Sequence, residues 1–530
     1  QGPLFVRCAS CHQTNTASAT TNIMSALIQR TVRAVSSSTL RPLAQQLGPA
    51  GSLLFVNEHS TDSRSFSAQA MLEGHTKEGK VMHETLLNAN ILNTQYAVRG
   101  ELYLKAEELR RAGKQIIFTN VGNPHALGQT PLTFNRQVMA LCTAPFLMDM
   151  PETAKMFPED AVARAKKVLT MIPGGIGAYS DSRGALGIRQ EVAQFISKRD
   201  GTPVEEINPD HIFLTDGASV AVRSCLNALI RNKNDGILVP VPQYPLYSAS
   251  IALYGGTMVP YSLDEGQNWG LSMESLKSAV AKARSEGIMV RGMVFINPGN
   301  PTGQCLSQEN LRELAKFAHE EKVVLMADEV YQENIYQDER PFVSMRKTIS
   351  EMGEPYRSEV ELLSFHTVSK GTVGECGLRG GYVEMKNIAQ GAVDELYKIA
   401  SVNLSPNVVG QVSMSLMMNP PQPGDASYDQ FVAEKAEILA SLRRRAHIMT
   451  DAFNSLEDVT CNFTEGAMYS FPQIRLPPKA IAAAQALGKQ PDVFYCLRLL
   501  EETGISTVPG SGFGQEPGTY HMRTTILPNE

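Results

Sequence analysis

The sequence predicts an α/β protein: a large domain with a mostly parallel sheet of the seven-stranded type between helices, plus a smaller α+β domain. Short apolar segments alternate with helical patterns from about residue 116 to 366. Such segments are typical of parallel strands buried on both faces. After about residue 410 the alternation stops and a long charged helical pattern begins, which indicates a separate, smaller unit.

The expected elements follow in order. Residues 101–114 have the pattern of a short helix ended by Gly113, and 116–118 follow as a strand. Further strands are expected at 211–215, 236–241, 291–297, 323–327 and 361–366, with helices at 218–230 and 308–322. Residues 428–456 predict a long charged helix, either continuous or broken, and 461–474 and 521–527 predict strands around shorter helices.

These patterns divide the chain into four expected regions. Residues 1–66 are interpreted as a transit peptide with upstream sequence, and 67–150 as an amino-terminal arm that completes part of the small domain. Residues 151–410 form the expected large, ligand-binding domain, and 411–530 the carboxyl-terminal small domain.

Composition excludes several classes of protein. The chain has 530 residues, 43% of them hydrophobic and 19% charged, so a sizeable core is expected. Its net charge of −6 argues against a nucleic-acid coat protein. We find no run of 18 apolar residues that would predict a membrane span, and no metal site is expected. Eight cysteines are too sparse for a disulfide scaffold, so free thiols in a reducing compartment are expected.

The amino-terminal segment has the composition of an organelle transit peptide. Residues 1–57 contain four arginines and no acidic residue, with many Ser, Thr and Ala. We expect a natural start at Met24, cleavage after Phe66 and a mitochondrial matrix location, with the chloroplast as the alternative. The haem-attachment pattern at residues 8–12 precedes that start and is interpreted as a chance match.

Three polar features follow expected strands in the first part of the large domain. Residues 215–219 join a strand to a helix, so this helix start either binds a phosphate or is an ordinary cap. Residues 297–303 follow the next such strand; they form a tight turn or bring Asn300 to the ligand-binding edge of the sheet. Asp328 and Tyr331 both come directly after a third expected strand. A buried Asp328 needs a cation, such as a protonated pyridine nitrogen, unless it caps a helix.

Two further features carry positive charge. Lys370 follows a strand beside hydroxyl residues; it is either a solvated surface lysine or a nucleophile for a Schiff base. Arg379 nearby suits a phosphate. Arg523 lies within an apolar strand-like segment, where a guanidinium is costly unless it meets an anion such as a substrate carboxylate.

Taken in order, these motifs resemble those of one family. The NPTG at 300–303, the D-x-x-Y at 328–331 and the S/T-x-x-K at 367–370 with Arg379 make the chain similar to the fold-type I pyridoxal-phosphate aminotransferases from about residue 80 onward. The strings NPGNPTGQ, KGTVGECGLRGGY and HMRTTIL are similar to the alanine branch of that family. The family usually adds a closing helix after the final strand, so a truncation after Glu530 is one expectation.

The resemblance implies roles for particular residues. Lys370 would form the Schiff base and shuttle the proton, Asp328 would keep the pyridine nitrogen protonated, and Arg523 with the backbone of Gly122 would hold the substrate carboxylate. The remaining cofactor contacts that the resemblance implies are Asn300 and Tyr331 at the ring hydroxyl, Tyr244 stacked on the ring, Gly217, Ala218, Ser219, Thr367, Ser369 and Arg379 at the phosphate, and Tyr179 at the phosphate of a neighbouring subunit.

The same resemblance implies an activity. It predicts a homodimer with shared sites that moves an amino group between L-alanine and 2-oxoglutarate by ping-pong chemistry, with pyridoxal 5'-phosphate as cofactor. Three alternatives stay open: a transaminase with glyoxylate as acceptor, a pyridoxal-phosphate lyase or synthase on the same fold, and a silent binding protein.

Overall fold

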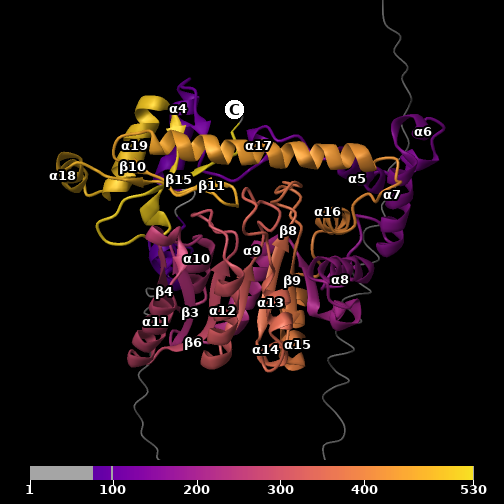
Figure 1. Cartoon of the computed structure of the whole chain (residues 1–530), viewed down its shortest axis with the longest axis horizontal. Helices are drawn as coiled ribbons and strands as arrows, with labels where there is room; N and C mark the ends of the chain where they lie inside the picture. Colours follow the sequence, from indigo (N-terminus) through magenta and orange to yellow (C-terminus); the bar gives the residue numbers. More distant parts are fainter. Residues whose placement is uncertain (1–75, 97–99, 529–530) are drawn as a thin grey trace, which may run out of the picture. The chain divides into compact units, whose positions relative to one another are not determined.

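The computed structural model describes residues 76–96 and 100–528 (Figure 1). The expected transit peptide, its processing site after Phe66 and the pattern at 8–12 lie outside the described residues and stay predictions. Within the described ranges, no helix is long and apolar enough to cross a membrane. The same ranges hold no cluster of three His, Cys, Asp or Glu side chains suited to a metal ion. The six cysteines that they include are free thiols.

The central sheet has eight strands in the order β2-β9-β8-β7-β6-β3-β4-β5. Strands β3, β4, β6, β7 and β8 run parallel, whereas β9 is antiparallel to both β2 and β8. The two-residue β5 adds an eighth strand, antiparallel to β4. The α/β prediction is therefore confirmed. The strands are β2 Ile212–Thr215, β3 Asp235–Val241, β4 Thr257–Asp264, β5 Gly270–Leu271, β6 Met289–Ile296, β7 Val324–Asp328, β8 Leu362–Thr367 and β9 Gly381–Lys386.

Alternate side chains of the central strands enter different cores. In β6, Met293 and Phe295 pack beneath α11, α12 and α13, whereas Val294 and Ile296 pack beneath α9, α10 and α15. Both faces of the sheet are therefore covered and shielded from water, which explains why the sequences of these strands are continuous apolar runs. The covering helices are α9 Ala218–Leu229, α10 Leu246–Leu253, α11 Met273–Ser285, α12 Gln308–Glu321, α13 Met345–Met352, α14 Tyr356–Glu359 and α15 Gln390–Val402.

A third core lies among helices at one edge of the sheet. Its buried residues come mainly from α5, α7, α8 and α16, with Ile212 and Leu214 of β2. These helices are α5 Thr133–Thr143, α7 Glu159–Met171, α8 Leu186–Asp200 and α16 Val408–Met418, and the short α6 spans Thr153–Met156.

Segments from both ends of the described chain pair with each other. β1 (Ile117–Phe118) runs parallel to β13 (Ile505–Ser506), and β11, β15 and β14 form a second small sheet. The other elements of this region are α3 Ala89–Asn93, α4 Glu101–Arg111, α17 Tyr428–Asn454, β10 Val459–Thr460, β11 Tyr469–Ser470, β12 Gln473–Ile474, α18 Pro478–Ala486, α19 Pro491–Thr503, β14 Val508–Pro509 and β15 Met522–Thr525.

Two expectations for this region need refinement. The long helix is unbroken: α17, drawn in orange, runs above the sheet in the view of Figure 1. The single strand expected at 461–474 is instead β11 and β12, and Pro472, which lies between them, has no N–H to donate to a strand partner. The four region boundaries stay predictions.

Candidate functional site

A cavity of about 440 Å³ opens where β6, β7 and β8 end, and Ile296, Asp328 and Thr367 line it. This is the edge at which parallel α/β sheets bind ligands. Most of the residues proposed from the sequence meet here. They are Gly122, Ala218, Ser219, Tyr244, Asn300, Asp328, Tyr331, Thr367, Ser369, Lys370, Arg379 and Arg523.

Asp328 has one satisfied and one free carboxylate oxygen. The side chain is 5% exposed, and the Tyr247 hydroxyl donates to Oδ2 over 2.7 Å. Its Oδ1 is buried and has no hydrogen-bond partner. Burial raises the pKa of Asp328 to about 6, although Tyr247 and the charge of Lys370 pull the pKa down. A cationic N–H donor brought to Oδ1 would satisfy that oxygen and restore the ionised form.

Lys370 follows β8 and reaches back into the cavity. Its Nζ donates to the carbonyl oxygen of Gly122 over 3.2 Å and lies 5.4 Å from the centre of the Tyr331 ring. The next residue, Gly371, donates its N–H to Asn334 Oδ1 over 2.9 Å, which fixes the loop that carries the lysine. A Cβ added at Gly122 would overlap the hydroxyl of Tyr469, so only glycine permits this close approach.

The amino terminus of α9 and the loop after β8 form a cluster of donors. Arg379 donates from Nη2 to the Asp216 carbonyl over 2.8 Å and to Ser219 Oγ over 3.2 Å. Thr367 Oγ1 lies 3.0 Å from Ser369 Oγ. Free N–H groups of a helix start, hydroxyls and a guanidinium together suit a phosphate group.

Arg523 on β15 is buried, at 1% exposure, and makes no ion pair within the described residues. It donates from Nη1 to Asn300 Oδ1 over 3.1 Å and from Nη2 to the Asn120 carbonyl over 2.6 Å, and its Nε has no partner. The guanidinium carbon lies 4.1 Å from the centre of the Tyr469 ring. A buried cation without an anion suits a substrate carboxylate.

Two aromatic residues close the cavity around these charged groups. The Tyr244 hydroxyl lies 3.0 Å from the hydroxyl of Tyr96 in the amino-terminal arm. Burial raises the pKa of Tyr331 well above its ordinary value, with a further contribution from Tyr469, so Tyr331 stays a hydrogen-bond donor.

Several side chains of this site were not predicted from the sequence. Tyr96, Cys376 and Tyr469 line the cavity, and Tyr247 supports Asp328 from behind. Only Cys376 lay in a string quoted above for the family, KGTVGECGLRGGY, and nothing marked it as a site residue. Each of them reaches the cavity by a contact between distant segments, for which one sequence carries no local signal.

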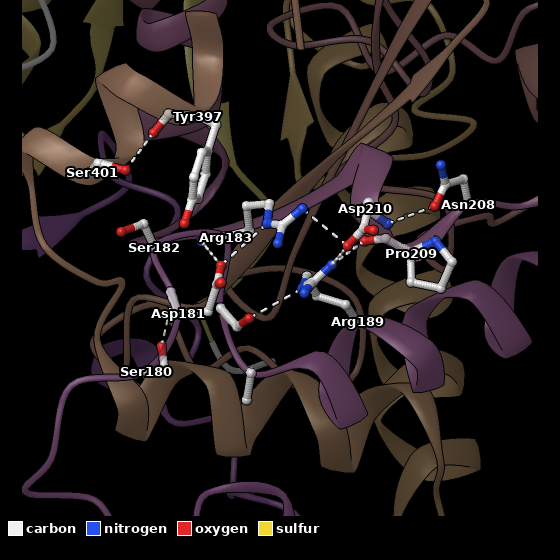
Figure 2. Close-up of polar contacts among 12 residues, drawn as sticks. Ser180, Asp181, Ser182, Arg183, Arg189, Asn208, Pro209, Asp210, Tyr397 and Ser401 are labelled. Carbon is white, nitrogen blue, oxygen red and sulfur yellow. Dashed lines mark hydrogen bonds and ion pairs between the residues drawn. The ribbon is translucent and has the colours of Figure 1, made fainter. Parts of the chain in front are cut away.

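Two proposed residues do not line the cavity. Gly217 lies just behind it, since a Cβ there would come within 2.5 Å of Arg379 Nη2. Tyr179 is 78% exposed, outside the cavity of its own chain. The residues after it are held firmly: Arg183 pairs with Asp181 at 3.2 Å and with Asp210 at 3.0 Å (Figure 2).

The comparison with protein families decides the identity of the fold and site. The sequence profile "Aminotransferase class I and II" matches residues 139–530. The chain belongs to this aminotransferase family. The resemblance proposed from the motifs is thereby confirmed, and the protein is a transaminase. Its family implies pyridoxal phosphate as cofactor.

Individual relatives of this aminotransferase carry two kinds of name. It is 65% identical over 451 residues, 85% of its own length and 93% of the relative's, to glutamate–glyoxylate aminotransferase 1 of Arabidopsis thaliana. It is 51% identical over 454 residues, 84% of its length and 83% of the relative's, to the mitochondrial alanine aminotransferase 2 of the same plant. Among solved structures, the alanine aminotransferase of Pyrococcus furiosus aligns with a TM-score of 0.67 at 23% identity, over 84% of this chain and 95% of that one, which supports the fold.

Proposed function

We propose that this aminotransferase binds pyridoxal 5'-phosphate in the cavity and moves the amino group between L-alanine and 2-oxoglutarate. One observation carries the proposal: a free carboxylate oxygen on Asp328, the amine of Lys370 and the unpaired guanidinium of Arg523 line one cavity. They match a pyridine nitrogen, a reactive aldehyde and a substrate carboxylate. A binding protein without activity would need none of the three.

The cavity residues fit this cofactor. The free Oδ1 of Asp328 would accept the ring N–H, Asn300 and Tyr331 would meet the ring hydroxyl, and Tyr244 would cover the ring. The phosphate would be held at the start of α9 by Ala218, Ser219, Thr367, Ser369 and Arg379, with Gly217 just behind them. When bound, pyridoxal phosphate supplies an aldehyde that bonds to an amine and a ring that takes up the electron pair released at the substrate Cα.

The chain's own groups then carry out the remaining tasks. Lys370 Nζ would hold the cofactor and, once freed as an amine, would take the proton from the substrate Cα. Asp328 would keep the ring nitrogen protonated, and Tyr247 holds its carboxylate in place. Arg523 and Gly122 orient the substrate carboxylate so that the Cα–H bond faces Lys370.

One cation of the cavity is available for a substrate carboxylate. Arg379 is assigned to the phosphate and Lys370 to the chemistry, so Arg523 alone meets a substrate carboxylate within the described residues. Alanine, pyruvate and glyoxylate carry one carboxylate, and 2-oxoglutarate and glutamate would present their α-carboxylate to the same guanidinium. A second candidate acceptor is glyoxylate, favoured by the 65% identity to a glutamate–glyoxylate aminotransferase.

Tyr179 supports a homodimer with shared sites. Its ring is exposed beyond its own cavity, and an ion-pair network fixes the segment that follows it. Ser182 adds a hydrogen bond to the Leu404 carbonyl over 2.6 Å. An exposed aromatic on a rigid segment is suited to reach the phosphate of a second copy. The transit-peptide composition and the mitochondrial name of one relative support a mitochondrial location.

Initial-rate kinetics test the activity. Purified residues 67–530 are assayed with L-alanine and either 2-oxoglutarate or glyoxylate, and pyruvate is measured. We expect parallel double-reciprocal lines, as ping-pong kinetics require. A kcat/KM more than tenfold higher for glyoxylate would move the assignment to the second candidate. No pyruvate with either acceptor would overturn alanine as the donor.

A further inference from the structure

Tyr469 lies between the two charged groups that the proposed reaction uses. It opens β11, is 3% exposed and pairs in register with Thr525 of β15. This pairing brings Tyr469 next to β15, the strand that also carries Arg523, and both side chains line the cavity. None of the roles assigned above includes Tyr469.

The hydroxyl of Tyr469 and the amine of Lys370 share the space over Gly122. A Cβ added at Gly122 would overlap the Tyr469 hydroxyl and come within 3.2 Å of Lys370 Nζ. That Nζ already donates to the Gly122 carbonyl over 3.2 Å. The rings of Tyr331 and Tyr469 meet edge to face with their centres 6.2 Å apart, and Lys370 Nζ lies 5.4 Å from the centre of the Tyr331 ring. The amine of Lys370 and the hydroxyl of Tyr469 therefore lie at one wall of the cavity.

The electrostatic surroundings favour Tyr469 as a hydrogen-bond acceptor. Burial alone would raise its pKa, but the positive charges of Lys370 and Arg523 hold the pKa of Tyr469 below its ordinary value. The pKa of Tyr331 moves upward instead. The titratable and charged groups that act on the Tyr469 hydroxyl are Lys370, Arg523, Tyr331 and Tyr244.

The ring of Tyr469 has a separate contact. The Arg523 guanidinium lies over its face, 4.1 Å from the ring centre, with Phe513 at 4.7 Å from the same guanidinium. A cation over an aromatic face is held electrostatically and by packing. One side chain thus contacts both charged groups, the amine through oxygen and the guanidinium through the ring.

We propose that Tyr469 is a positioning residue for transamination: its hydroxyl accepts a hydrogen bond from the protonated Lys370 amine, and its ring orients Arg523. The inference rests on the proposed function, in which Lys370 takes a proton from the substrate Cα. That transfer leaves a positive charge on Nζ, and a hydroxyl oxygen already in place stabilises the charge as it forms.

Two substitutions separate the two contacts. Tyr469→Phe keeps the ring over Arg523 and removes the hydroxyl, so kcat should fall roughly ten- to a hundredfold with little change in KM. Tyr469→Leu removes both, so KM for the amino acid should rise as well. Tyr261→Phe is the matched control, because it removes another buried tyrosine hydroxyl, bonded to the Val294 carbonyl and outside the cavity. It should leave kcat and KM unchanged.

A pH titration of the visible absorption band of the cofactor-loaded protein gives a readout besides turnover. Loss of the acceptor should lower the midpoint in Tyr469→Phe by about one pH unit, because the positively charged nitrogen of Lys370 loses a partner. The control should titrate like the wild type. A wild-type protein with no band would overturn the proposed function together with this inference. A coloured, active wild type with an unchanged midpoint and kcat in Tyr469→Phe would overturn the role of Tyr469 alone.

Discussion

Two consecutive carboxyl groups at the end of β7 lie in different surroundings. Asp328 and Glu329 are 5% and 1% exposed, and burial raises both pKa values, to about 6 and about 7. Asp328 faces the open cavity with one oxygen unpartnered, whereas Glu329 accepts a hydrogen bond from the Met345 N–H over 2.7 Å.

The surroundings of Glu329 form a closed polar cluster beside α8 and α13. Arg199 pairs with Asp200 at 2.7 Å, Arg346 lies 3.7 Å from Glu384, and burial lowers the pKa of His366 to about 3. None of these residues lines the cavity. A shifted pKa alone therefore does not mark a functional carboxylate; the free oxygen facing open space separates Asp328 from Glu329.

Removing one cation from the cavity and one from the closed polar cluster should give the largest difference between the two regions. Lys370→Ala should abolish transamination, by more than about a thousandfold, because the proton acceptor is lost, while cofactor binding and thermal stability persist. Arg346→Met should instead lower the stability by about 3 kcal/mol, since Glu384 loses its buried partner. Turnover per cofactor-loaded molecule and the melting temperature are measured for both. Retained activity in Lys370→Ala would contradict the assignment.

Neutralising each carboxylate in turn sharpens the comparison. Asp328→Asn should reduce kcat roughly a hundredfold or more, because nothing then keeps the ring nitrogen protonated. Glu329→Gln, its neighbour on the chain, should change kcat less than about threefold because it contacts no ligand. Equal losses of kcat in the two variants would mean that the closed cluster also takes part in catalysis.

Glu329 should change how the stability of the folded protein depends on pH. Its pKa is about 7 in the folded protein against an ordinary value of 4.5, so the folded state keeps a proton that the unfolded chain releases. Its contribution to stability is full below pH 4.5 and is lost as the pH rises to about 7. Relative to Glu329→Gln, the wild type should therefore lose roughly 2–6 °C in melting temperature over this interval. Parallel melting curves across that range would argue that Glu329 is ionised.

The smallest effect is expected at the ion-pair network near Tyr179 (Figure 2). Arg183→Gln loosens the segment without touching the cavity, so cofactor affinity should fall only a few-fold. Tyr179→Phe should produce a loss of similar size, and the double variant should add little. Cofactor affinity and the dimer dissociation constant are both measured. Additive losses would mean that Arg183 acts independently of Tyr179.

Most of the site could be predicted from the sequence because its residues follow strands. Asp328, Lys370 and Asn300 each come just after a short apolar run, and parallel strands place such positions at one edge. The sheet could be predicted because strands buried on both faces appear in the sequence as short apolar runs that alternate with helical patterns. Arg523 was found because a charge within an apolar segment is conspicuous.

The missed residues depend on contacts between distant segments. Tyr247 reaches Asp328 from α10, 81 positions earlier in the chain, and Tyr96 meets Tyr244 from the amino-terminal arm. Tyr469 enters the cavity only because β11 pairs with β15. A tyrosine in an apolar segment usually indicates core packing, and only the fold shows which hydroxyl faces a ligand.

The central claim, that one cavity carries out both half-reactions, is tested most directly by the visible spectrum of purified residues 67–530 loaded with cofactor. L-alanine is added alone, followed by 2-oxoglutarate. We expect the absorption band to be lost with alanine and to return with 2-oxoglutarate. A yellow protein that ignores alanine would point to another amino donor. A colourless protein that takes up no cofactor would contradict the site built on Lys370 and Asp328.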